Sequence, residues 1–153
     1  MQLSNVLSLD CTKSAVLCSS KNKVLEMICE IASEHCGQDI SSLFSGMLAR
    51  EKIGSTGIGN GIAIPHTRMS SSEEAVAVLI QCQEPIGFNA IDNRPVDILF
   101  ALLVPEKKCK EHLKTLACIA ERLNDKRVLR KLRKARSDKE LFSVMINQSE
   151  GNH

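Results

Sequence analysis

The sequence predicts an α/β fold, in which a single domain holds a β-sheet between layers of helices. The chain has 153 residues, which is enough for one compact domain and too few for two ordinary ones. Residues 97–104 (DILFALLV) are almost continuously apolar, as is typical of a central strand covered on both faces. Segments with helical spacing of apolar residues lie before and after this strand, and together these features favour a sheet between helix layers.

The first elements of the chain are predicted to be a short strand and two helices. Residues 15–18 form a short apolar run that is typical of an edge strand. Ser20 can cap a helix whose apolar positions have helical spacing, and Gly37 ends it. A second amphipathic helix is expected to begin at Asp39 or Ser41.

A glycine-rich segment follows this second helix, which we expect to end near Lys52. Residues 54–61 (GSTGIGNG) hold four glycines in eight positions and therefore predict a loop with unusual backbone angles. Residues 62–64 then form a short apolar strand that Pro65 stops. His66 comes next, so its ring is expected at a strand end with a rigid backbone before it.

Two longer strands are predicted over residues 75–83 and 96–104. Turns are expected between them at residues 84–87 and 91–94, where glycine, proline, asparagine and aspartate occur. Residues 69–74, just before the first of these strands, are expected to form a surface loop.

The last part of the chain is predicted to be helical. A helix after Pro105 carries an apolar stripe, which consists of Leu113, Leu116, Ala117, Ala120 and Leu123. The basic segment 126–136 continues with apolar residues at Val128, Leu129 and Leu132. Ser137 and Glu140 form a capping box that opens a final helix.

Composition limits the classes of function. Residues 1–153 are expected to form one domain, with a core from about residue 3 to 147 and a polar tail from Gln148 onward. The net charge of +2 is no footprint of a protein that binds nucleic acid or anionic lipid, and an aromatic content of 3% counts against base stacking. No stretch approaches the roughly 20 apolar residues that span a bilayer. The basic segment 126–136 is either a solvated surface or a patch that binds an anionic partner.

The seven cysteines predict reduced thiols in the cytoplasm. Their number is odd, no CxxC motif occurs, and the N-terminal residues lack the pattern of a secretory signal. His35 and Cys36 do not have the spacing of a metal site, and no further ligands are expected to cluster near them. We therefore expect neither a metal nor a cofactor.

His66 is the residue with the most evident chemical potential. Neutral imidazole is a nucleophile near neutral pH and can accept a phosphoryl group. Backbone N–H groups of a glycine-rich loop can approach phosphate oxygens closely. The loop matches neither nucleotide-binding fingerprint, however, and a lone histidine beside such a loop is often structural. Composition and spacing alone leave both roles open.

A family resemblance favours the chemical role. Residues 50–66 (REKIGSTGIGNGIAIPH) resemble the active-site signature of the fructose/mannitol-type enzyme IIA family of the phosphoenolpyruvate-dependent phosphotransferase system, and especially its nitrogen-regulatory branch. Residues 92–105 (DNRPVDILFALLVP) and 3–7 (LSNVL) resemble the same branch. The resemblance covers essentially the whole chain and implies a mixed, mostly parallel sheet between helices.

The resemblance implies a phosphocarrier. His66 would accept a phosphoryl group from an HPr- or NPr-like phosphocarrier, as a tele-phosphohistidine on Nε2. The protein would then signal to regulated targets such as sensor kinases or transporters. One alternative is a sugar-specific EIIA component that passes phosphate to a IIB domain for uptake. Another is a binding module whose histidine is inactive.

The resemblance also implies supporting residues. Arg50 matches the family's active-site arginine, whose guanidinium can bind phosphoryl oxygens; read alone, it is a helix-end arginine. His112 matches the second histidine, which would donate a hydrogen bond to the phosphoryl group; read alone, it is a surface residue. The loop groups expected at the phosphate are those of Ser55, Thr56, Gly57, Gly59 and Gly61. Thr67 departs from the smaller residue of many members and is expected to alter the fit of a partner.

Overall fold

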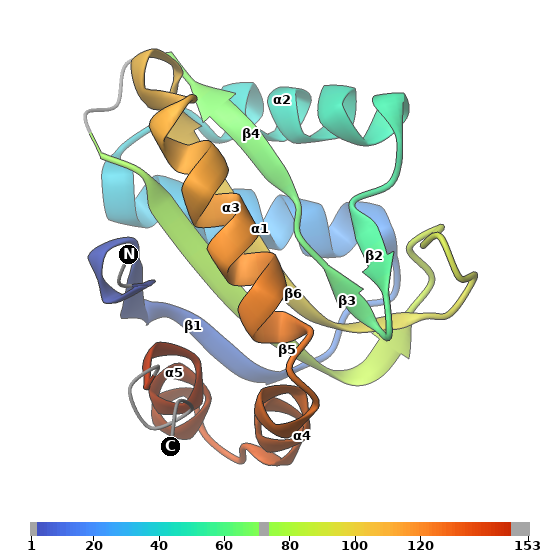
Figure 1. Cartoon of the computed structure of the whole chain (residues 1–153). Helices are drawn as coiled ribbons and strands as arrows, with labels where there is room; N and C mark the ends of the chain where they lie inside the picture. The colour runs from blue at the N-terminus through green and yellow to red at the C-terminus, as the bar shows by residue number, and fades with distance from the viewer. Residues whose placement is uncertain (1–2, 71–73, 148–153) are drawn as a thin grey trace.

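The computed structural model describes residues 3–70 and 74–147. A six-stranded sheet lies between two layers of helices (Figure 1). Its strands are β1 (Leu7–Val16), β2 (Gly57–Gly59), β3 (Ile62–Ala63), β4 (His66–Met69), β5 (Val76–Ile86) and β6 (Val96–Pro105). The helices are α1 (Lys21–Cys36), α2 (Ile40–Ile53), α3 (Glu111–Leu123), α4 (Lys126–Lys134) and α5 (Asp138–Ile146), with short 3₁₀ helices at Leu3–Asn5 and Glu106–Lys108. The predicted α/β fold is confirmed, while the expected polar tail lies outside the described residues.

The sheet is mixed and mostly parallel, as the resemblance implied. Its order is β1-β5-β6-β3-β2, and β4 also pairs with β6. Strand β1 pairs with β5 in parallel, as β3 and β4 do with β6, whereas β5–β6 and β2–β3 are antiparallel. Strands β3 and β4 follow each other along the same side of β6, with Ile62 opposite Ile98 and His66 opposite Leu102. His66 is therefore the first residue of a strand beside the most buried strand of the sheet.

The central strands separate two hydrophobic cores. In β6, Leu99, Ala101 and Leu103 face the core under α1 and α2. The alternate residues Ile98, Phe100 and Leu102 face the core under α3, α4 and α5. This division explains the nearly continuous apolar run, because successive side chains of a strand point to opposite faces.

The predicted starts of α1, α2 and α5 and the predicted end of α1 are confirmed by their caps. The Ser20 hydroxyl accepts a hydrogen bond from the Lys23 N–H, and Gly37 ends α1 in the left-handed conformation at φ 75°. Asp39, not Ser41, caps α2 and accepts from the Ser42 N–H. The Ser137 hydroxyl accepts from the Glu140 N–H at the start of α5, as the capping box predicted.

Several strand boundaries were wrong. Strand β1 is at the sheet edge but begins at Leu7. Strand β5 continues to Ile86, into the turn predicted at 84–87, and its pairing with β6 is irregular between Gln81 and Ile86. Part of the loop predicted at 54–61 is the hairpin β2–β3. Pro65 does not stop the chain's pairing with β6, because its carbonyl accepts from the Leu102 N–H and no donor is needed there.

The surface loop predicted at residues 69–74 is only partly tested. Met69 is the last residue of β4 and is buried, which contradicts a loop at this position. Ser70 and Glu74 are exposed, and residues 71–73 lie outside the described residues.

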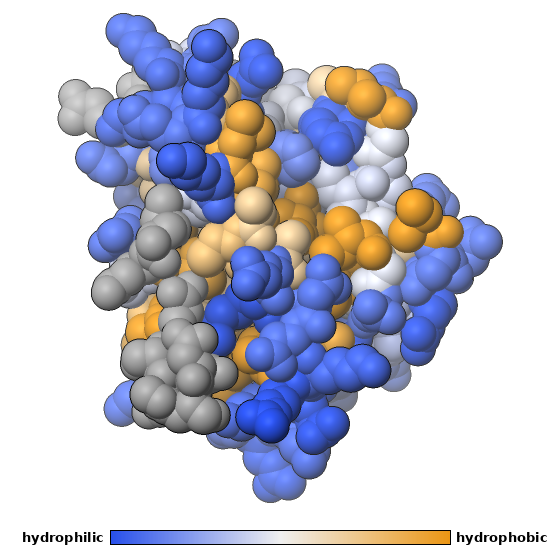
Figure 2. All heavy atoms as spheres, in the orientation of Figure 1, coloured by the Kyte–Doolittle hydropathy of each residue, from blue (hydrophilic) through white to orange (hydrophobic). Residues whose placement is uncertain are grey.

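The predicted stripe of α3 is confirmed in part, since Leu123 is buried and Leu116 and Ala120 pack against the core, but the fully buried face differs from it. The fully buried face consists of Thr115, Ile119 and Leu123, whereas Leu113 is 64% exposed. The apolar surface of α3 is thus wider than the face it packs on the sheet. Figure 2 shows hydrophobic surface between α3 and the β3–β4 side of the molecule.

The basic segment 126–136 contains helix α4. Its residues Val128, Leu129 and Leu132 are buried in the core, as their spacing predicted, and its basic side chains form hydrophilic surface (Figure 2). Arg133 makes an ion pair with Asp97 at 2.9 Å. Within residues 3–70 and 74–147, no helix has both the length and the apolar content needed to cross a membrane.

Candidate active site

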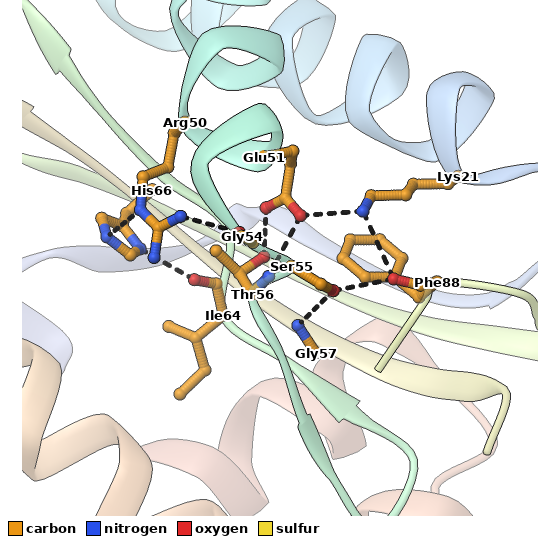
Figure 3. Close-up of polar contacts among 10 residues, drawn as sticks. All are labelled: Lys21, Arg50, Glu51, Gly54, Ser55, Thr56, Gly57, Ile64, His66 and Phe88. Atoms are coloured by element: carbon orange, nitrogen blue, oxygen red, sulfur yellow. Dashed lines mark hydrogen bonds and ion pairs between the residues drawn. The ribbon is translucent and has the colours of Figure 1, made fainter. Parts of the chain in front are cut away.

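His66 lies half-buried at the start of β4, and both of its ring nitrogens have partners (Figure 3). Nδ1 is 2.9 Å from the carbonyl oxygen of Ile64. Nε2 is 3.2 Å from Nε of Arg50, which comes from the last turn of α2. The short peptide segment around Pro65 therefore brings the ring to its own backbone on one side and to a helix on the other.

These two contacts define the tautomer of neutral His66. A carbonyl oxygen can only accept, so Nδ1 must carry the proton that lies toward Ile64. The Nε–H of Arg50 can only donate, so Nε2 must present a lone pair. Both contacts require the same tautomer, in which Nε2 is the nucleophilic nitrogen.

Arg50 joins the end of α2 to the imidazole. Besides its contact with His66, it donates from Nη1 to the carbonyl oxygen of Gly54 at 2.8 Å. Gly54 is the C-cap residue of α2, so the arginine also places positive charge at the helix C-terminus. Arg50 is thus both a cation at the helix end and a partner of His66.

His112 lines the same groove as His66 and Arg50. This groove has a volume of about 580 Å³ and is bounded by α2, β4 and the start of α3. Nδ1 of His112 lies 3.1 Å from the hydroxyl of Thr115, whose side chain is fully buried. Three residues that are far apart in the sequence thus meet at one groove, as the resemblance implied.

The hydroxyls expected to bind phosphate have internal partners. Ser55 donates from Oγ to the carbonyl oxygen of Phe88 at 2.8 Å and accepts from the Gly57 N–H at 3.0 Å. The Thr56 hydroxyl donates to the carboxylate of Glu51, and its backbone N–H donates to the same carboxylate at 3.0 Å. These groups hold the segment together behind His66.

The glycines expected at the phosphate have packing roles in this structure, and their proposed contact with phosphate stays a prediction. An added Cβ at Gly57 would meet Ala90, and one at Gly59 would lie 3.4 Å from a carboxylate oxygen of Asp92. Gly61 has φ 79° at the hairpin turn, and an added Cβ there would meet Arg133. These glycines allow close packing and a tight turn. None of the three is among the residues that line the groove with His66.

Glu51 is a residue of this network that sequence reasoning missed. Its side chain is only 6% exposed and makes an ion pair of 2.9 Å with Lys21, at the start of α1. Lys21 also lies over the ring of Phe88, with Nζ 4.5 Å from the ring centroid. A charged residue in the last turn of a helix is usually solvated, so the pattern gave no signal beyond its place next to Arg50.

A second cluster corrects the expectation that no ligand-type groups lie near His35. Asp10 and Cys11 of β1 lie beside it, and the potential ligand atoms of the three residues are within 4.8 Å of one another. The exposed carboxylate of Asp10 is 3.0 Å from His35 Nδ1, whereas Cys11 is buried. The hydrogen bond from Ser8 has the largest effect in lowering the pKa of Asp10, and the hydrogen bond from His35 lowers it further.

The chain is similar to a family model, to curated proteins and to solved structures. A family model described as "Phosphoenolpyruvate-dependent sugar phosphotransferase system, EIIA 2" matches residues 5–148. The chain is 51% identical over 152 residues to a nitrogen regulatory protein of Escherichia coli strain K12, covering 99% of this chain and 93% of that protein. It is 50% identical over 153 residues to a nitrogen regulatory protein of Klebsiella oxytoca, covering 99% and 94%. The crystal structure of nitrogen regulatory protein IIA-Ntr from Neisseria meningitidis has a TM-score of 0.87 at 32% identity, covering 94% of this chain and 98% of that one.

Proposed function

The chain belongs to the EIIA 2 family of the phosphoenolpyruvate-dependent sugar phosphotransferase system, and on this premise we propose that it carries a phosphoryl group on Nε2 of His66. The observation that carries the proposal is the pair of contacts on the imidazole. The Ile64 carbonyl holds the proton on Nδ1, and Nε2 is left with a lone pair beside Arg50 in an open groove.

The transfer needs little covalent chemistry from this protein. The lone pair of His66 Nε2 attacks the phosphorus of a phosphohistidine on the donor, and the donor's P–N bond breaks in line. Its electron pair returns to the donor ring, which leaves as neutral imidazole when its other nitrogen is protonated. The Nδ1 proton of His66 faces the Ile64 oxygen, so the positive charge that develops on the ring is stabilised during attack.

Arg50 and His112 are proposed to bind the phosphoryl oxygens. Once Nε2 is bonded to phosphorus it can no longer accept from Arg50, and the guanidinium N–H groups then lie beside the new oxygens. His112 can donate from Nε2 when the Thr115 hydroxyl donates to its Nδ1.

The donor is proposed to be an HPr- or NPr-like phosphocarrier that docks over the groove. Two large apolar side chains at the groove support this, since Ile53 of α2 is 84% exposed and Leu113 of α3 is 64% exposed. Exposed apolar side chains on either side of a reactive group are typical of a protein-binding surface.

We propose a regulatory role in the cytoplasm, not a role in sugar uptake. The identity of about half to two nitrogen regulatory proteins supports the regulatory role. Phosphorylation adds a charge of roughly −1.5 to −2, which changes the surface that a target protein meets at His66. All seven cysteines lie in the described residues and none forms a disulfide, which favours a reducing compartment.

The test is phosphorylation by phosphoenolpyruvate, enzyme I and HPr-type carriers, followed by intact mass. We expect wild type to gain one acid-labile phosphoryl group and His66→Ala to gain none while keeping its circular dichroism and thermal unfolding profile. Normal labelling of His66→Ala would refute His66 as the acceptor. A wild type that no carrier labels would favour the binding-module alternative.

A further inference from the structure

We propose that Glu51 is a positioning residue, which acts through Thr56 and Ile64 to hold His66 in the tautomer that leaves Nε2 reactive. This inference rests on the proposed function, because the tautomer matters for transfer only if Nε2 is the acceptor. Glu51 itself touches neither the imidazole nor the groove, and its action is carried by three successive contacts.

The first contact fixes the segment that follows α2. The two carboxylate oxygens of Glu51 accept from the backbone N–H and the hydroxyl of Thr56, so both donors of this buried residue are satisfied by one side chain. Lys21 balances the charge of this carboxylate at 2.9 Å, and the Glu51 side chain is only 6% exposed. Figure 3 shows this group between α1 and α2, next to the loop that it holds.

The second and third contacts lead from Thr56 to the ring. The Thr56 carbonyl accepts from the Ile64 N–H at 3.0 Å, next to the Gly57–Ala63 pair of the β2–β3 hairpin. This bond orients the backbone of Ile64, whose carbonyl accepts from Nδ1 of His66 at 2.9 Å. A displacement of Thr56 would therefore move the acceptor that keeps the proton on Nδ1.

Neighbouring residues of α2 thus act on opposite nitrogens of the same imidazole. Arg50 contacts Nε2 directly, and Glu51 acts on Nδ1 through the hairpin. A histidine without such partners populates both tautomers, and the form with the proton on Nε2 has no lone pair there to attack phosphorus. That form would also place its N–H against the N–H of Arg50. The contacts that fix the tautomer therefore set the fraction of molecules in which Nε2 can attack phosphorus.

The sharpest variant is Glu51→Gln, which keeps the shape of the side chain. Glutamine offers one carbonyl oxygen in place of two carboxylate oxygens, so Thr56 loses an acceptor and Lys21 loses its counter-charge. Thr56→Val removes only the hydroxyl contact, and Thr56→Ser restores it. Glu30→Gln is the matched control, because it removes the same charge from an exposed position on α1.

The tautomer is read directly from ¹⁵N-histidine NMR spectra of the unphosphorylated protein. We expect wild type and Glu30→Gln to show His66 as the Nδ1–H form. Glu51→Gln and Thr56→Val should shift the ring signals toward a mixture, with Thr56→Ser close to wild type. Single-turnover transfer from a phosphorylated carrier should fall about 10- to 100-fold in Glu51→Gln, the scale of a reactive group held out of position.

The outcomes separate this inference from the proposed function. A folded Glu51→Gln that keeps the wild-type ring signals would overturn the positioning role, even if its transfer rate fell. If Glu51→Gln does not fold, Thr56→Val against Thr56→Ser decides in the same way. A shifted tautomer in a protein that no carrier phosphorylates would retain the positioning role and refute the proposed function.

Discussion

At the scale of single residues, Arg50 has two tasks that depend on the shape of its side chain. Its Nε–H donates to Nε2 of His66, the nitrogen proposed to be phosphorylated. Its Nη1 donates to the Gly54 carbonyl oxygen at the end of the same helix. A guanidinium can make both contacts because its donors form a fixed, planar fork. The residue therefore links the geometry of the helix end to the geometry of the His66 ring.

Arg50→Lys is expected to slow transfer although it conserves charge. One ammonium cannot reach the imidazole and the Gly54 carbonyl with the same geometry, so we expect a fall of at least tenfold, and of about 10²- to 10³-fold for Arg50→Ala. Rapid-quench measurement of transfer from a phosphorylated carrier would test this. Arg130→Ala, at an exposed position on α4, should leave the rate unchanged, and wild-type transfer by Arg50→Lys would exclude a fork-specific role.

The cysteines differ in reactivity because of their burial. Burial raises the pKa of the Cys29 and Cys82 thiols to about 12, so almost no thiolate is present at neutral pH. At about pH 8 we expect iodoacetamide to modify half-buried thiols such as Cys36 and Cys109 before Cys29 and Cys82, which should react only in denaturant. Peptide mass spectrometry of the native and the denatured protein would measure this order, and early labelling of Cys29 would contradict it.

At the scale of elements, the position of α2 over β4 depends on one close contact. A Cβ at Gly46 of α2 would overlap the hydroxyl of Thr67, which is buried in β4 beside His66. Thr67 also lines the groove beside His66, so the expectation that it alters the fit of a partner stays a prediction. Gly46 accommodates the bulk that threonine adds at this position.

Gly46→Ala is expected to destabilise the protein by about 1–3 kcal/mol, although alanine favours a helix, because the added methyl group overpacks the contact. Combining it with Thr67→Ala should recover most of this loss, since the two sites are in contact and their effects are not additive. Urea unfolding of the four proteins of the cycle would measure the coupling. Gly54→Ala has open space around its added methyl group and should change stability by less than about 0.5 kcal/mol.

The elements that sequence reasoning predicted well are those with a local signal. The caps at Ser20, Asp39 and Ser137 and the buried run of β6 each follow from a few neighbouring residues. Strand β4 was missed because Pro65 breaks a strand by itself, whereas here the pairing partner needs only its carbonyl. The face of α3 was predicted only in part, because apolar spacing does not say which side of a wide apolar surface meets the sheet.

The site was predictable only in part for a related reason. His66, Arg50 and His112 were proposed from a family resemblance, because they lie on different elements and no spacing joins them. Glu51 remained unnoticed since its burial and its contacts with Lys21 and Thr56 exist only after α1 and α2 have packed together. Long-range contacts of this kind leave no periodic trace in the sequence.

At the scale of the whole molecule, the sheet separates the side that carries most of the site from the side that supports the fold. Helix α2 contributes Arg50 and packs on one face, whereas α4 and α5 pack on the other face with no residue at the groove. Met47 and Leu132 are fully buried in these two cores, one on each side of the sheet. Similar losses of packing at these positions should therefore have different consequences for transfer.

We expect Met47→Ala and Leu132→Ala each to lose about 2–5 kcal/mol of unfolding free energy, because each leaves a cavity in a close-packed core. Met47 lies one helical turn before Arg50, so its loss should also loosen the contact with His66 and slow transfer several-fold. Leu132→Ala should retain the wild-type rate per folded molecule. Urea unfolding combined with single-turnover transfer, measured where both variants are folded, tests this difference. Equal slowing of transfer in both variants would mean that both cores affect the site. It would contradict the prediction that only the core under α2 does so.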